Sequence, residues 1–83
     1  MSNIDKDLYL SIGDQLKTAR EKKGYSLDYL VNLIGGIKTK SSLKRYEDGE
    51  SRIEIDILEK ICDKLDLNYS EVVAKAKAYA VQK

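Results

Sequence analysis

The chain has 83 residues, of which 42% are hydrophobic and 35% are charged, and its 15 basic and 14 acidic side chains leave a formal net charge of +1. This length allows a single domain, residues 1–83, and the apolar content excludes a disordered chain. Histidine is absent and Cys62 is the one cysteine, which excludes an internal disulfide, a cysteine-based metal cage and the commonest acid–base catalyst. No apolar stretch has the length of a signal peptide or membrane span, so we expect a cytoplasmic protein. Because these residue types assemble no catalytic constellation, we also expect that it is not an enzyme.

Helices joined by short turns are favoured, because proline is absent and glycine occurs only five times. The first predicted helix covers residues 5–23, where apolar residues recur at helical spacing before the stop at Gly24, at Leu8, Ile12, Leu16 and Ala19. Leu8, Tyr9 and Leu10 fit either a longer first helix or a flexible arm, and the pattern does not decide between them.

Two short helices follow. Ser26 is a good N-cap for the second helix, which Gly35 and Gly36 end and whose apolar stripe is Leu27, Leu30, Val31 and Ile34. Either Thr39 or Ser41 caps a third helix that runs to about Asp48, where Asp48-Gly49 marks a turn.

The fourth and fifth helices complete an all-α, compact five-helix bundle. After a loop over residues 49–55, with Asp56 near the helix start, one arc of the fourth helix holds Ile57, Leu58, Ile61, Cys62 and Leu65. Asn68 and Glu71 resemble a capping box that opens the fifth helix, whose apolar side is Val72, Val73, Ala76, Tyr79 and Ala80. We expect the first turn of this last helix in the core and its end available to a partner.

Positive charge gathers on the third helix. Between Gly36 and Arg45 the chain has four basic residues and no acidic one, whereas residues 47–56 hold five acids. Leu43 and Tyr46 share one side of the helix, and the opposite arc holds Lys40, Ser41, Lys44 and Arg45. Cations and small hydroxyls on an outer face suit the DNA major groove, although a merely solvated basic face has the same pattern.

Two short helices joined by a glycine-containing turn are typical of a helix-turn-helix. Residues 12–73 resemble the phage-repressor family of the lambda Cro/C1 type, also called XRE-like, in the order and spacing of Ile12-Gly13, Leu16-Lys17, Arg20, Gly24, Ser26, Leu30, Gly35, Arg45-Tyr46-Glu47-Asp48-Gly49, Leu58, Leu65 and Val72-Val73. The resemblance implies a five-helix DNA-binding domain whose third helix is the recognition helix. It also implies a homodimer on a pseudo-palindromic operator.

Three positions depart from the family pattern. Leu27 stands where a DNA-contacting glutamine is usual, and Ile53 stands where proline is common. The stretch from Gly35 to Glu47 is about two residues longer than the family's turn and recognition helix, with residues 35–38 absorbing the excess. That excess shifts the expected register of the base-contacting residues by up to about one position.

Several side chains are expected to be structural. Arg20 and Glu47 both tend inward, and because an isolated buried charge is costly we predict that they pair, as the resemblance also implies. Tyr46 is assigned to the core and Cys62 to a buried, inert thiol. Tyr25 is either an anchor near the DNA backbone or a lid on the corner between the first two helices.

The predicted function is sequence-specific binding of double-stranded DNA by a transcriptional repressor that occupies its operator, with no cofactor or metal. Base readout is assigned to Lys40, Ser41, Ser42, Lys44 and Arg45, and phosphate contacts to Lys38, Thr39 and Arg52, with Glu50 and Glu54 diluting the positive field. The chain also fits the N-terminal part of a longer repressor. A protein anti-repressor or regulator is a further expected partner. The alternative is a protein-interaction module, such as an antitoxin or adaptor, which Leu27 and the acidic stretch favour.

Overall fold

Five α-helices account for most of the chain in the computed structural model, which describes residues 3–82. They are α1 (Asn3–Lys22), α2 (Leu27–Leu33), α3 (Lys40–Glu47), α4 (Ile55–Lys64) and α5 (Tyr69–Gln82), and no strand occurs within this range. The predicted all-α, five-helix architecture is therefore confirmed.

The first helix settles the choice left open by the sequence. Its residues from Asn3 onward are helical, and Leu8 and Tyr9 pack against the core, so this segment extends α1 rather than forming an arm. The helix ends where Gly24 adopts a φ of 75°, a left-handed conformation that costs glycine least.

Side-chain caps fix the starts of three helices. Ser26 Oγ accepts a hydrogen bond from the Tyr29 amide at 3.0 Å, and Thr39 Oγ1 accepts one from the Ser42 amide at 3.1 Å, so Thr39 rather than Ser41 is the cap of α3. Asn68 Oδ1 accepts one from the Glu71 amide at 3.0 Å, as the capping-box pattern predicts. These bonds satisfy amide groups that the first turn of a helix leaves unpaired.

The start of α4 differs slightly from the expectation. The helix begins at Ile55, inside the predicted loop, with Glu54 at the N-cap position but without a side-chain cap bond. The carboxylate of Glu54 is bonded instead to side chains outside α4. Ile53, at the position where the family often has proline, is buried and anchors the loop to the core.

Every helix contributes to one core. Its members share nearly complete burial: Ile12, Leu16, Leu30, Ile34, Leu43, Tyr46, Ile53, Ile57, Leu58, Ile61, Cys62, Leu65, Val72 and Ala76. Cys62 is only 1% exposed, and burial raises the pKa of its thiol to about 11. Because the thiolate is the reactive form, this thiol is inert near neutral pH, as predicted.

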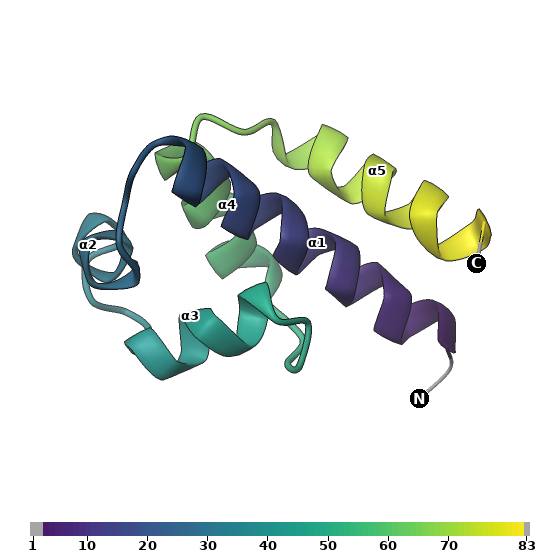
Figure 1. Ribbon diagram of the computed structural model, residues 1–83, viewed down its shortest axis with the longest axis horizontal. Helices are drawn as coiled ribbons and strands as arrows, with labels where there is room; N and C mark the ends of the chain where they lie inside the picture. Colours follow the sequence, from purple (N-terminus) through teal and green to yellow (C-terminus); the bar gives the residue numbers. More distant parts are fainter. Residues whose placement is uncertain (1–2, 83) are drawn as a thin grey trace.

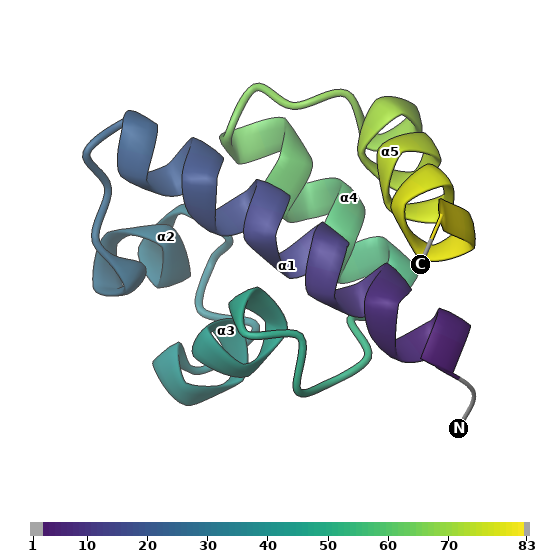
Figure 2. The ribbon, with the colours of Figure 1, turned by 45° about the vertical axis from the view of Figure 1, so that its right-hand side comes forward.

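The long helix α1 runs through the middle of the bundle, with α3 on one side and α5 on the other (Figures 1 and 2). The backbones of α1 and α3 are in close contact at Gly13. A Cβ atom added to Gly13 would lie 2.5 Å from the carbonyl oxygen of Glu47 and closer still to that of Tyr46. The end of α3 therefore rests directly on the backbone of α1.

The connection between α2 and α3 covers residues 34–39. Gly35 and Gly36 both have positive φ, at 75° and 70°, which lets the chain turn out of α2 at low conformational cost. Leu27, at the start of α2, is partly buried against the core. Its side chain therefore serves packing, and α2 lacks the polar contact that the family usually has at this position.

Candidate nucleic-acid interface

The helix α3 has two chemically different faces. Its inner face buries Leu43, Tyr46 and Glu47. Its outer face, which we call the basic arc, is exposed and consists of Lys40, Ser41, Lys44 and Arg45. The predicted division of α3 into a buried and an exposed basic side is thus observed.

A buried ion pair fixes the orientation of this helix. Arg20 on α1 donates to both carboxylate oxygens of Glu47, at 2.7 and 3.0 Å, and to the backbone oxygen of Tyr25 at 2.7 Å. The Glu47 carboxylate raises the pKa of Arg20, which favours its charged form. The predicted pair between these two residues is therefore confirmed, and it connects α1, the corner before α2, and α3.

Two of the predicted DNA contacts lie in the first turn of α3 and have partners within the protein. Thr39 Oγ1 donates to Ser42 Oγ at 3.1 Å and accepts from the Ser42 amide. Ser42 is half-buried and lies beside the basic arc rather than on it. Both hydroxyls form part of the helix cap, and their roles toward phosphate and base stay predictions.

Most of the predicted DNA-binding cations pair with a carboxylate. Lys40 Nζ lies 3.4 Å from Asp28, Lys44 Nζ lies 3.3 Å from Asp48, and Lys38 Nζ lies 2.6 Å from Glu54. Arg52 lies 3.5 Å from Asp5 on α1, with its guanidinium 5.9 Å from the ring centre of Tyr9. Within residues 3–82, Arg45 is the basic-arc cation without an ion pair.

The carboxylate of Glu54 binds two side chains at once, which the sequence did not predict. It accepts a hydrogen bond from the Tyr46 hydroxyl at 2.6 Å and pairs with Lys38. Lys38, and then Tyr46, lower the pKa of this carboxyl to about 2. Tyr46 lies eight residues before Glu54 and Lys38 sixteen, on separate elements, so no local spacing signalled the cluster.

The corner between α1 and α2 carries two aromatic side chains. The rings of Tyr25 and Tyr29 meet edge to face with centres 4.8 Å apart, and Lys23 Nζ lies 5.9 Å from the centre of the Tyr25 ring. Tyr25 is half-buried against the core and its carbonyl holds Arg20. These contacts favour a role for Tyr25 as a lid on the corner between α1 and α2 over a role as an anchor near the DNA backbone.

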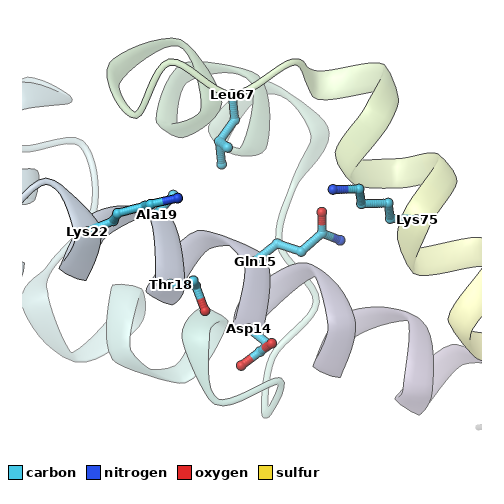
Figure 3. Close-up of a pocket in the computed structure, with 7 residues that line it drawn as sticks. All are labelled: Asp14, Gln15, Thr18, Ala19, Lys22, Leu67 and Lys75. Atoms are coloured by element: carbon cyan, nitrogen blue, oxygen red, sulfur yellow. The ribbon is translucent and has the colours of Figure 1, made fainter.

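A separate pocket of about 340 Å³ opens between α1 and α5. Figure 3 shows Lys22 and Lys75 directed toward it from opposite ends, above Gln15. Gln15 Nε2 donates to the Val72 backbone oxygen at 3.0 Å, which holds α5 to α1. The pocket lies on the α5 side of α1, away from α3, so it is not part of the basic arc.

Within residues 3–82, no group of three aspartate, glutamate or cysteine side chains could hold a metal ion. None of the five helices is long and apolar enough to cross a membrane.

Comparison with known proteins agrees with this geometry. A helix-turn-helix family model matches residues 16–72, from the middle of α1 into α5. A relative in Pyrococcus abyssi named "Putative HTH-type transcriptional regulatory protein" is 43% identical over 54 residues, which are 61% of this chain and 16% of that protein. A relative of the same description in Thermococcus kodakarensis is 42% identical over 60 residues, 68% of this chain and 18% of its own length.

The chain therefore spans less than a fifth of the length of these relatives. The matched region contains α2, α3 and the buried pair between Arg20 and Glu47. This chain belongs to the Cro/C1-type, XRE-like helix-turn-helix family.

Proposed function

We propose that this chain binds double-stranded DNA sequence-specifically and represses transcription in the cytoplasm by occupying an operator. The observation that carries the proposal is the basic arc of α3, which is exposed while the opposite side of the same helix is locked into the core. A helix that is held rigidly and presents cations and hydroxyls outward suits the major groove.

The proposed contacts differ in kind along the arc. Arg45 and Lys40 are our candidates for direct contact with base edges, because both are exposed cations that can donate to guanine. Ser41, Ser42 and Lys44 lie between or beside them. Phosphate contacts are assigned to residues outside α3, namely Lys38 and Thr39 before it and Arg52 in the loop after it, which would hold the helix in register.

We expect a homodimer on a pseudo-palindromic operator, with a protein regulator as a further partner. Two-fold symmetry in such proteins places two recognition helices one helical turn of DNA apart. No cofactor and no catalytic step are part of this mechanism.

The test is a fluorescence titration of the protein against DNA from upstream of its own gene and against a scrambled duplex, at several salt concentrations. Arg45→Ala should cost about 1–3 kcal/mol on the preferred site and relax preference at one base pair per half-site, with little effect on the scrambled duplex. Equal weakening on both duplexes would mean that Arg45 contacts phosphate, and base reading would then fall to its neighbours.

Lys75→Ala is the matched control for this titration. It removes the same charge from α5, on the side of α1 away from α3 (Figure 1). It should leave both the affinity and the base preference unchanged, because exposed charges that far from the duplex are largely screened by salt.

An adaptor that binds protein is the second candidate function. The pairing of Lys38, Lys40, Lys44 and Arg52 with carboxylates favours it, because the face around α3 is nearly neutral overall. If the protein binds no upstream DNA fragment at low salt while a protein partner co-purifies with it, the adaptor function replaces repression as the favoured hypothesis.

A further inference from the structure

The four ion pairs around α3 differ in length and in solvent exposure. Those of Lys40, Lys44 and Arg52 have nitrogen–oxygen distances of 3.3–3.5 Å, and each cation is more than half exposed. The pair between Lys38 and Glu54 is 2.6 Å long, and the Lys38 side chain is only 28% exposed. Long, exposed pairs exchange readily with solvent and salt, whereas a short one with a partly covered cation is held.

The carboxylate in this short pair is itself anchored. Tyr46 is buried in the core and donates its hydroxyl to one oxygen of Glu54 at 2.6 Å, which leaves the other oxygen for Lys38. The backbone of Glu54 lies at the N-cap of α4, but its side chain makes no cap bond there. The Tyr46 hydroxyl therefore restrains the carboxylate, and the pair must break for Lys38 to move outward to another anion.

We propose that Glu54 competes with the DNA backbone for Lys38 and so sets how many phosphates this domain neutralises. The inference rests on the proposed DNA-binding function and deepens it. Lys38, two residues before α3, makes its proposed phosphate contact only when this pair opens, and while the pair is intact it contributes little to DNA affinity. Release of Lys38 adds one phosphate contact, which strengthens binding to every sequence alike because phosphates carry no base information.

The experiment compares wild-type protein, Glu54→Gln, Lys38→Ala and the double variant on operator and scrambled duplexes between 50 and 200 mM salt. Glu54→Gln should raise affinity several-fold on both duplexes and steepen the salt slope by about 0.9, the value for one added phosphate. Lys38→Ala should change affinity less than twofold in the wild-type background. The same change should abolish the gain in the Glu54→Gln background.

Tyr46→Phe separates competition from a merely structural role. It removes the hydroxyl bond that anchors Glu54 but leaves the carboxylate beside Lys38, so the salt slope should lie closer to the wild-type value than to that of Glu54→Gln. All titrations are made at a temperature where circular dichroism shows each variant folded, and Glu54→Ala serves as a second variant that lacks any acceptor for Lys38.

Three results would overturn the inference. If both Glu54 variants bind the scrambled duplex no better than wild type, or if Lys38→Ala is equally damaging in both backgrounds, Glu54 does not compete for Lys38 although DNA binding stands. If wild type and all variants fail to bind any duplex at low salt, the proposed function fails, and the competition fails with it.

Discussion

The ion pair between Arg20 and Glu47 neutralises two buried charges and connects α1 to α3. Both are buried, and the guanidinium satisfies the two carboxylate oxygens and a backbone carbonyl at once. A buried charge that loses its partner is left without solvent to compensate it. The pair thus orients α3 through α1, and it does so without occupying the basic arc.

Glu47→Gln should destabilise the fold, because Arg20 would keep its charge without a counter-ion. We expect a loss of about 3–5 kcal/mol in the free energy of unfolding, the usual cost of breaking such a pair. Urea unfolding followed by circular dichroism measures it. Glu50→Gln, which removes an exposed charge just beyond α3, should have almost no effect, and equal midpoints for the two variants would contradict the prediction.

Acid should weaken the contribution of Glu54 to the stability of the fold in a defined range of pH. The pKa of this carboxyl falls from an ordinary 4.5 to about 2 in the folded protein, so its stabilising effect is present above pH 4.5 and is lost as the pH falls toward 2. The difference in melting temperature between wild type and Glu54→Gln should therefore shrink over this range. Melting curves at pH 7, 4.5 and 2 test this, and a constant difference would argue against it.

At the scale of elements, α1 is the support on which the recognition helix rests. Its backbone passes so close to the end of α3 at Gly13 that no side chain fits between them. The contact is between backbones, so neither partner can yield by changing a rotamer. The position of α3 therefore depends on a glycine in another helix.

Gly13→Ala should force α1 and α3 apart and destabilise the protein by about 1–3 kcal/mol or more, as overpacking does. The measurement is the urea midpoint. Thr18→Ala, at an exposed position of the same helix, is the control and should be close to neutral. A neutral Gly13→Ala would mean that α1 and α3 do not approach as closely as described.

At the scale of the whole molecule, the features that the sequence predicted were mainly local. Caps, glycine stops and helical spacing located all five helices, because the groups that decide them are within four residues of one another. The pair between Arg20 and Glu47 was also predictable, since two inward charges of opposite sign have few alternatives. The contacts of Glu54 and the partners of Lys40 and Arg52 were not, because they depend on how separate elements pack.

The far end of the bundle presents apolar side chains to solvent. On α5, Val81 is 77% exposed and Tyr79 is 39% exposed. We expect this end to contribute to the proposed homodimer, so Val81→Lys should weaken binding to a full operator while leaving the melting temperature and binding to an isolated half-site unchanged. Sedimentation of the free and DNA-bound protein checks the stoichiometry, and unchanged full-site affinity would place the dimer contact elsewhere.

The two faces of α3 have a consequence for how this protein can diverge. Stability depends on Leu43, Tyr46 and Glu47, whereas the four members of the basic arc make no buried contact. Randomising the arc in a library should therefore yield mostly folded proteins, from which selection could recover new operator preferences on the same scaffold. If the arc reads bases as proposed, inherited changes at these four positions can alter the preferred DNA site without compensating mutations in the core.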